Sequence, residues 1–232
     1  MTISEQLKQI ISDYDAVIKV IDKDARESED RAYGGFVRMA KGRLQEHISE
    51  NIARIAWQNI GGNPDNLEIN SKKVSIPMKP SYLNRIKDDE VVNHIKKNIV
   101  NYVYKLSVDK HIYVNKKFVI GIECKAFAEN AMIKRILIDF DLLQTQYPNL
   151  SCYLFQLESQ LGGDYSELTK PIYGSYSTRT LQSYFSCELN IITLLQGERN
   201  INRPIHKNFK SLRLEQLSDA MEILAEDMKR FH

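Results

Sequence analysis

Residues 118–127 read FVIGIECKAF. This apolar run, rich in β-branched and aromatic residues, is typical of a strand buried on both faces of a sheet. It nevertheless contains two charged residues, Glu123 and Lys125. Because side chains alternate along a strand, both project from one face, while Cys124 projects from the other. Burying a carboxylate and an ammonium group is costly unless the two pair or bind a ligand. They therefore form either a structural ion pair or part of a functional site.

The segment before this strand carries another acidic residue. Residues 103–114 have a similar β-rich composition, and a short polar stretch separates them from the strand. The two segments predict a β-hairpin. If its turn has three residues (115–117), Asp109 lies directly opposite Glu123, with their Cβ atoms about 5 Å apart. A two-residue turn shifts the register by one residue and sends Asp109 to the opposite face.

The rest of the chain alternates helical and β-strand patterns. Apolar residues recur at helical spacing over residues 3–21, 36–56, 82–101, 128–144 and 212–228. Short β-like runs occupy residues 67–70, 74–78, 150–158 and 188–195. Residues 162–186, rich in Gly, Ser, Thr and Tyr, predict a long surface segment. The order predicts an α/β (α+β) fold, with helices flanking a central mixed β-sheet, in a single domain over residues 1–232.

Composition excludes several classes of protein. The chain has 232 residues, of which 43% are hydrophobic and 27% charged, so it is neither disordered nor fibrous. No apolar run is long enough to span a membrane. The three cysteines lie far apart without a CxxC pair, which argues against a zinc site or a disulfide framework and favours the cytoplasm. The net charge of +2 permits many partners and requires none.

An Asp on one strand followed by Glu-x-Lys on the next resembles the motif of the PD-(D/E)XK nuclease superfamily. The three residues are Asp109, Glu123 and Lys125. Residues 41–46 (KGRLQE) add a Gly-x-x-x-Glu pattern ending in Glu46, similar to a helix that many restriction endonucleases carry ahead of the sheet. Val108 stands where the strict motif has proline. The order of these features looks most like a type II restriction endonuclease.

The resemblance also implies an organisation of the chain. Residues 36–160 form the catalytic core, with a restriction-endonuclease-like fold. An N-terminal helix and linker over residues 1–35 precede it. A DNA-recognition region over residues 161–213 and a C-terminal helix over residues 212–232 follow.

The family's chemistry assigns roles to the charged residues. Asp109 and Glu123, with the Cys124 carbonyl, would hold one or two Mg²⁺ ions, for which Mn²⁺ substitutes. Lys125 would orient the attacking water and stabilise hydroxide, or act as a base if its pKa is depressed. Glu46 would complete the shell of a second metal or orient a water. Glu50, one turn further, could substitute, and Glu46 could equally be a solvated surface residue.

Basic residues gather in the C-terminal third of the chain. Between Thr169 and Arg213 there are seven Lys and Arg residues against two Glu residues. Nearby hydroxyl and aromatic side chains are suited to phosphates and base edges. The DNA-contact candidates in this region are Lys170, Tyr173, Ser175, Ser177, Thr178 and Arg179, with Arg179 the candidate guanine reader. Lys134 and Arg135 are candidates for phosphate contacts, although Lys134 could instead pair with Asp139 or Asp141.

These observations favour a Mg²⁺-dependent type II restriction endonuclease that cuts double-stranded DNA at a short specific site. Cutting two strands related by two-fold symmetry requires two sites, and the chain has one motif, so we expect a homodimer. The expected setting is a prokaryotic cytoplasm, with a cognate DNA methyltransferase as genetic partner. Two alternatives are a repair or recombination nuclease of the same fold, and a non-catalytic DNA-binding module whose charged residues form a buried ion network.

Overall fold

The central sheet of the molecule has five strands. The computed structural model describes residues 1–27, 31–163, 165–200 and 209–232. The strands are β1 (Leu67–Asn70), β4 (Lys110–Val114), β5 (Lys117–Ala128), β6 (Ser151–Ser159) and β7 (Leu189–Thr193), in the spatial order β1-β4-β5-β6-β7. The β1–β4 and β4–β5 pairs are antiparallel, whereas β5, β6 and β7 run parallel. The predicted mixed sheet is confirmed.

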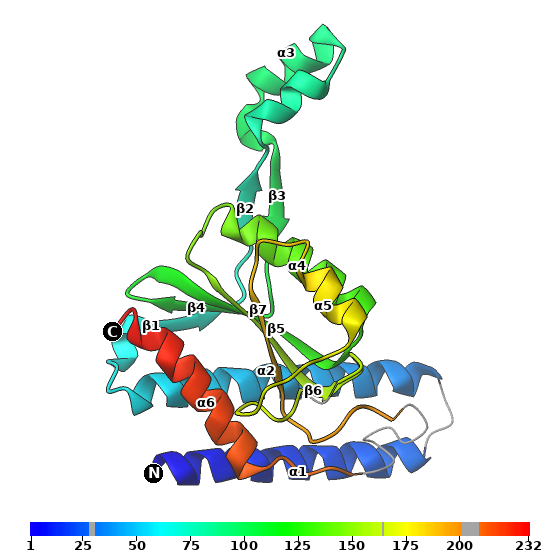
Figure 1. Ribbon diagram of the computed structural model, residues 1–232, viewed down its shortest axis with the longest axis vertical. Coiled ribbons are helices and arrows are strands. Elements are labelled where there is room, and N and C mark those ends of the chain that lie inside the picture. The colour runs from blue at the N-terminus through cyan, green and yellow to red at the C-terminus, as the bar shows by residue number, and fades with distance from the viewer. Residues whose placement is uncertain (28–30, 164, 201–208) are drawn as a thin grey trace.

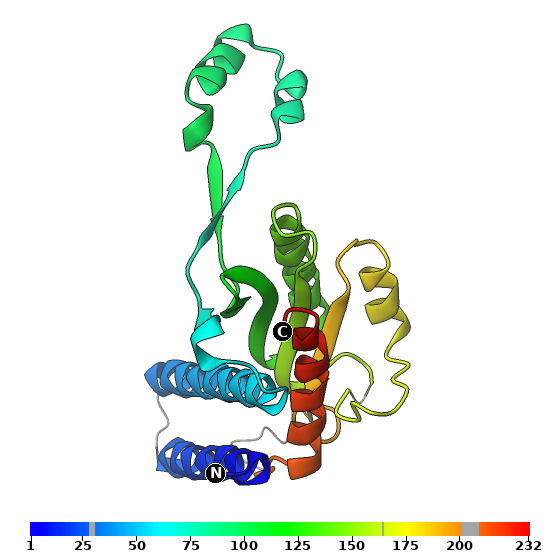
Figure 2. The ribbon, with the colours of Figure 1, turned by 90° about the vertical axis from the view of Figure 1, so that its left-hand side faces the viewer.

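Helices cover both faces of this sheet (Figures 1 and 2). The helices on one side are α1 (Ile3–Glu27), α2 (Arg31–Asn59) and α6 (Leu214–Lys229), and those on the other are α4 (Asn130–Gln144) and α5 (Tyr176–Gln182). Each side has its own hydrophobic core, in which apolar side chains from the helices meet those of the sheet. Gly121 of β5 allows close packing on the α4 side, because a Cβ atom there would lie 2.8 Å from the Phe140 ring. The α+β fold predicted from the sequence is therefore correct.

The structure settles the length of the turn in the β4–β5 hairpin. Val114 pairs with Lys117, so the turn has two residues, Asn115 and Lys116, with φ angles of 50° and 66°. Of the two turn lengths left open by the sequence, the hairpin has the shorter one. A β-bulge between Ile112 and Tyr113 of the ladder then absorbs one residue of β5, and Lys110 pairs with Ile122. The bulge thus restores the register that places Asp109 next to Glu123.

The segment between β1 and β4 differs from the expectation. Residues 103–114 are not one strand: β3 (Val103–Leu106) ends before β4 begins and pairs with β2 (Val74–Pro77) in a separate two-stranded sheet. The helix expected over residues 82–101 is shorter. The observed elements are the 3-10 helix η2 (Pro80–Arg85), α3 (Asp89–Lys97) and the 3-10 helix η3 (Ile99–Asn101). Residues 71–106 form an arm that projects from the rest of the molecule (Figures 1 and 2).

Two further boundaries differ. The second helix begins at Arg31 rather than at residue 36, and the surface segment expected over residues 162–186 contains the short helix α5. No helix in the described part of the chain is both long and apolar enough to cross a bilayer.

Candidate active site

The hairpin brings Asp109, Glu123 and Lys125 together. Asp109 immediately precedes β4, and the other two residues share one face of β5. Lys125 Nζ lies 2.5 Å from Glu123 Oε1 and 3.7 Å from Asp109 Oδ2, and it donates a hydrogen bond to the Cys124 carbonyl oxygen at 3.1 Å. The Asp109 and Lys125 side chains are each about one-third exposed, at 32% and 31%. Two carboxylate oxygens and one carbonyl oxygen thus surround the Lys125 ammonium group, at a position that solvent can reach.

The backbone of β5 holds Asp109 in this arrangement. The Cys124 N–H donates to Asp109 Oδ2 at 2.7 Å. On the other face of the strand the Cys124 side chain is buried, and its Sγ lies 3.2 Å from the Ser49 hydroxyl of α2. Cys124 therefore connects the site to α2 through its side chain and to Asp109 through its backbone.

Burial and charge shift the pKa values of the two central residues. Burial raises the pKa of Glu123 above its ordinary value, and the Asp109 carboxylate raises it further, although Lys125 opposes both effects. Burial alone would lower the pKa of Lys125, but the Glu123 and Asp109 carboxylates outweigh it and raise that pKa. The two carboxylates therefore favour the protonated form of Lys125 in this arrangement.

His111 supports the site from within the core. It is fully buried and stacks on Phe118 with ring centroids 4.5 Å apart. Its Nε2 accepts a hydrogen bond from the Val108 N–H at 3.1 Å, and burial lowers its pKa to about 4. The neutral ring thus holds the backbone of the residue before Asp109 in place.

Glu46 and Glu50 of α2 both face Lys110, the residue after Asp109. The Lys110 Nζ lies 3.5 Å from Glu46 Oε2 and 3.1 Å from Glu50 Oε2. Glu50 is also paired with Arg54 at 2.8 Å, whereas the Glu46 side chain is 39% exposed. The helix thus places Glu46 near the cluster, with the Lys110 side chain in contact with its carboxylate.

Two neighbours of the cluster were not expected from the sequence. Asp139 of α4 is close enough for its charge to raise the pKa of Glu123, and Lys125 in turn acts on Asp139. Gln156 of β6 pairs in register with Lys125, is fully buried, and leaves its Oε1 without a hydrogen-bond partner among the described residues. Both lie far from the motif in sequence, and only the packing of α4 and β6 on β5 brings them to it.

The donor atoms suit a hard divalent cation, because carboxylate and carbonyl oxygens are the ligands that Mg²⁺ prefers. Asp109, Glu123 and the Cys124 carbonyl supply this set. Within the described ranges, however, no group of three or more His, Cys, Asp or Glu side chains is arranged to hold a metal ion. A metal here would therefore depend on two side chains, the backbone carbonyl and water.

The candidate DNA contacts around α5 fall into two groups. Thr178 is fully buried and donates to Leu161 O at 3.0 Å and to Asn130 Oδ1 at 2.7 Å. Arg179 donates to the Tyr173 carbonyl at 3.0 Å and to the Ile172 carbonyl at 2.5 Å. These two side chains shape the segment that carries them.

The remaining candidates in this region are accessible, as is Arg179 itself. Tyr173 is 86% exposed. Ser177 is exposed and accepts a hydrogen bond from Asn130 Nδ2, while Ser175 caps the N-terminus of α5 by accepting from the Thr178 N–H. Lys170 pairs with Glu167 at 3.2 Å.

The α4 candidates, Lys134 and Arg135, are both exposed. Arg135 lies 3.9 Å from Asp139, so it is the neighbour of this aspartate. Asp141 accepts a hydrogen bond from the Cys187 N–H instead. Lys134 pairs with neither aspartate among the described ion pairs and remains available for phosphate.

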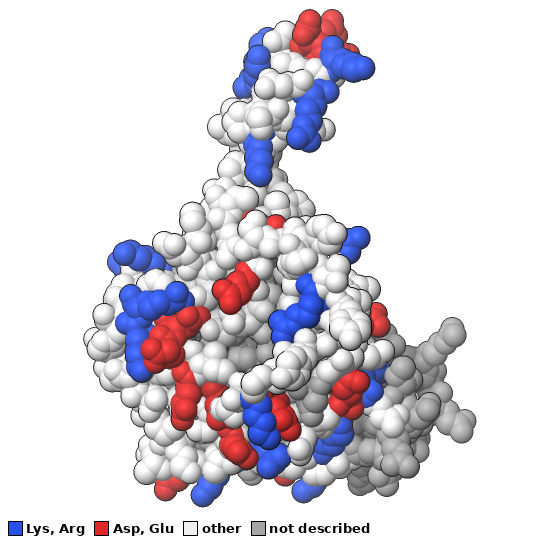
Figure 3. All heavy atoms as spheres, in the orientation of Figure 1, with Lys and Arg blue, Asp and Glu red and all other residues white. Residues whose placement is uncertain are grey.

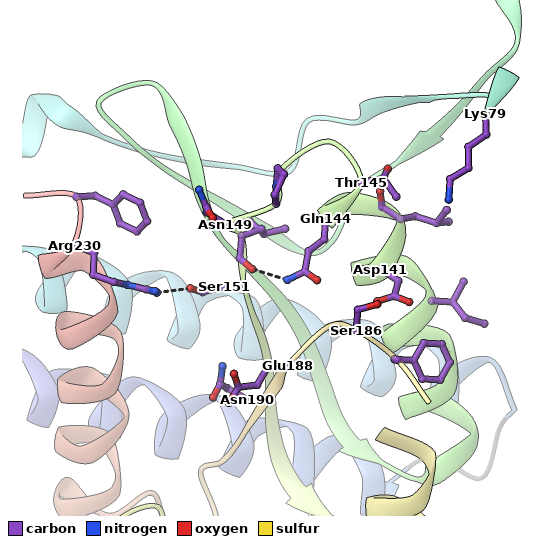
Figure 4. A pocket seen from close by; sticks show the side chains of 16 residues that line it. Lys79, Asp141, Gln144, Thr145, Asn149, Ser151, Ser186, Glu188, Asn190 and Arg230 are labelled. Carbon is purple, nitrogen blue, oxygen red and sulfur yellow. Dashed lines mark hydrogen bonds between the residues drawn. The ribbon is translucent and has the colours of Figure 1, made fainter. Parts of the chain in front are cut away.

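A large pocket of about 1090 Å³ lies elsewhere, and Figure 4 shows its polar lining. Ser151 and Asn190 place it at the amino ends of β6 and β7, away from the Lys125 end of β5. Within it, Arg230 donates to Ser151 and Gln144 donates to the Leu150 carbonyl. The pocket does not include the charged cluster, which lies on a different part of the surface.

Comparisons with known proteins give one strong similarity. The chain is 52% identical over 231 residues to "Type II restriction enzyme DdeI" of Desulfomicrobium norvegicum (strain DSM 1741 / NCIMB 8310), covering 97% of this chain and 96% of the relative. No family model and no solved structure matches the chain. The similarity spans the hairpin and the helices around it.

Proposed function

The chain belongs to the type II restriction enzymes and is a site-specific deoxyribonuclease, and we propose that it cuts double-stranded DNA with Mg²⁺ held at the Asp109–Glu123 cluster. The observation that carries this proposal is the convergence of Asp109, Glu123 and the Cys124 carbonyl on the Lys125 ammonium. A restriction enzyme as relative favours this function over a repair nuclease or a non-catalytic DNA-binding module.

The three oxygen donors would hold Mg²⁺, with Mn²⁺ as a substitute. When bound, the ion lowers the pKa of water and offsets negative charge on the phosphate that is attacked. The Cys124 N–H keeps Asp109 turned toward this position, at 2.7 Å from its carboxylate oxygen. Glu46 would complete the shell of a second metal or orient a water from α2.

Lys125 would act through its positive charge. Its raised pKa favours the protonated form, in which it would donate hydrogen bonds to the attacking water or to a phosphate oxygen. A fixed ammonium at this place stabilises the extra negative charge of the pentacovalent transition state. Of the two roles that the motif implies for Lys125, we propose this one, because the pKa of the ammonium is raised and not depressed.

The DNA would lie across the exposed side chains near α4 and α5. Lys134 and Arg135 are placed to contact backbone phosphates, which position a duplex without reading it. Lys170, Tyr173, Ser175 and Ser177 would reach bases or phosphates from the α5 segment, while Thr178 and Arg179 hold that segment in shape.

The assembly we propose is a homodimer acting on a short site with two-fold symmetry. Each protomer contributes one Asp109–Glu123–Lys125 cluster, so two copies cut the two strands. We place the enzyme in the cytoplasm, with a methyltransferase of the same specificity that protects the host DNA.

The metal site can be tested without measuring cleavage. Asp109→Asn removes one carboxylate but keeps an oxygen that accepts the Cys124 N–H. Asp141→Asn is the matched control, because Asp141 also accepts a backbone N–H, from Cys187 at 3.0 Å. Thermal unfolding with increasing Mg²⁺ should show a rise in Tm for the native protein and for Asp141→Asn, since a ligand that binds only the folded state stabilises it. Asp109→Asn should show no rise; an equal rise in both variants would place the metal elsewhere.

A further inference from the structure

The arm, residues 71–106, has no role in the cluster described above. Its two strands pair from Val74 with Leu106 to Pro77 with Val103, and the Met78 N–H continues the ladder to Tyr102 O at 3.0 Å. Beyond the ladder, α3 and the two 3-10 helices stand clear of the other helices in both views (Figures 1 and 2).

The base of the arm is fixed next to the active site. Ile76 and Leu106 are buried in the same core cluster as Val108 and the apolar residues of α4. The strand β3 ends only three residues before Asp109. The direction of the arm is therefore set by the same packing that places the catalytic aspartate.

The arm has a strongly positive net charge. It has eight Lys and Arg residues against three Asp and Glu residues, a net charge of +5, whereas the whole chain has +2. The rest of the chain is therefore negative by three charges. On the face drawn in Figure 3, Lys and Arg side chains lie at both edges and at the base of the arm, and the visible acidic side chains lie at its tip.

The acidic and basic residues of the arm differ in the interactions that their side chains make. Asp88 caps α3 by accepting from the Glu90 and Val91 N–H groups, and Asp89 and Glu90 lie in the first helical turn, where negative charge is favourable. The cations have fewer partners. Among the described residues, no ion pair with a carboxylate involves Lys79, Arg85, Lys87, Lys96 or Lys97. The acidic residues of the arm thus have a structural role in α3, whereas most of its basic residues form no ion pair among the described residues.

We propose that the arm lies along the DNA duplex beside the cleavage site and binds its phosphates through Arg85, Lys96 and Lys97. This inference rests on the proposed function, which supplies the duplex. A duplex carries about one negative charge per 1.7 Å of its axis, so a rigid projection with a charge of +5 fits it. Two such arms repel each other, which argues against a contact between the arms of two copies, although exposed apolar residues such as Val100 and Tyr104 lie on the arm.

The length of the arm sets where the contact falls. Four residue pairs at about 3.3 Å each give a ladder of about 13 Å. At about 3.4 Å per base pair, this corresponds to roughly four base pairs before the helical tip begins. The arm therefore reaches phosphates outside the immediate site, in flanking DNA of any sequence.

The test uses the double variant Lys96→Gln/Lys97→Gln, which keeps side-chain length and helix propensity. The matched control is Lys8→Gln/Lys19→Gln, two exposed lysines of α1 at the opposite end of the molecule (Figure 1). Dissociation constants are measured in EDTA on two duplexes that contain the site mapped from digested plasmid DNA, one with flanks of about 3 base pairs and one with flanks of about 10.

We expect the arm variant to bind the long duplex about tenfold more weakly than the native protein and the short duplex equally well, with the control unchanged on both. The slope of log K against log salt should fall by about two, one for each lost phosphate contact. Native affinity on the long duplex, or an equal loss on both duplexes, would overturn the inference. So would unchanged DNA affinity together with a change from dimer to monomer in sedimentation, which would make the arm a contact between two copies. Native protein that cuts no DNA with Mg²⁺ would instead contradict the proposed function.

Discussion

Lys125 occupies the place where the negative ligands of the site converge, 2.5 Å from Glu123 and 3.7 Å from Asp109. Lys125→Met keeps most of the side-chain volume and removes the charge. We expect cleavage to slow by at least ~10²-fold, the usual effect of losing a positioned catalytic group, while the dissociation constant for DNA changes less than about threefold. Lys117→Met, on the exposed start of the same strand, is the control and should cut normally. Cleavage by Lys125→Met at the native rate would remove Lys125 from the mechanism.

His111 makes the stability of the fold depend on pH. Its pKa is about 4 in the folded protein against 6.5 when unfolded, so the folded state favours the neutral ring. Above pH 6.5 the ring is neutral in both states, so its titration does not reduce the free energy of unfolding. As the pH falls from 6.5 toward 4, the unfolded chain gains a proton first, and the free energy of unfolding decreases. At pH 5 the loss amounts to about 2 kcal/mol.

The comparison that isolates this effect uses His111→Gln, whose amide oxygen can still accept the Val108 N–H. Urea unfolding in EDTA at pH 7.5 and pH 5 should show that the native protein loses about 2 kcal/mol more than His111→Gln. Equal losses in the two proteins would mean that His111 is not buried in its neutral form.

At the scale of elements, the β4–β5 turn limits the stability of the hairpin that holds the site. Asn115 and Lys116 both have positive φ angles, the geometry that two-residue hairpins need and for which Asn-Gly is preferred. Lys116→Gly should therefore stabilise the protein by about 0.5–1 kcal/mol, which raises Tm by about 1–4 °C for a chain of this size. Lys117→Gly, in the strand itself, should lower Tm. A fall in Tm for Lys116→Gly would show that the turn has a different geometry in solution.

The same hairpin shows what could be predicted from the sequence. Alternation along residues 118–127 placed Glu123 and Lys125 on one face, because that depends only on local geometry. The turn length was left open, and the two-residue turn places Asp109 beside Glu123 only because the bulge between Ile112 and Tyr113 restores the register. A bulge depends on how β5 packs against both cores, so it leaves no local signal in the sequence.

The arm and α5 show the limits more clearly. Apolar spacing over residues 82–101 predicted a helix, but no spacing indicates that the segment projects from the molecule rather than packing on it. In the α5 segment, Thr178 had the right chemistry for DNA, but its side chain is buried and its hydroxyl donates to Leu161 O. The sequence shows which side chains can donate hydrogen bonds, but the tertiary structure determines which acceptors they meet.

For the whole molecule, the account joins a rigid mixed sheet, one charged cluster at the edge of the β4–β5 hairpin, and a basic arm fixed next to Asp109. The two cores on either side of the sheet keep β5 in place, so the cluster is preorganised before DNA binds. In our proposal, the side of the sheet with α2 supports the cluster, and the side with α4, α5 and the arm would contact DNA.

The most direct test of this account is a digest of plasmid DNA by the native protein and by Glu123→Gln, each with Mg²⁺ and with EDTA. Glu222→Gln, an exposed residue of α6, is the control. We predict discrete fragments with Mg²⁺ for the native protein and the control, and intact DNA in EDTA and with Glu123→Gln. Discrete fragments from Glu123→Gln at the native rate, or from the native protein in EDTA, would contradict the assignment of the Asp109–Glu123–Lys125 cluster as the catalytic site.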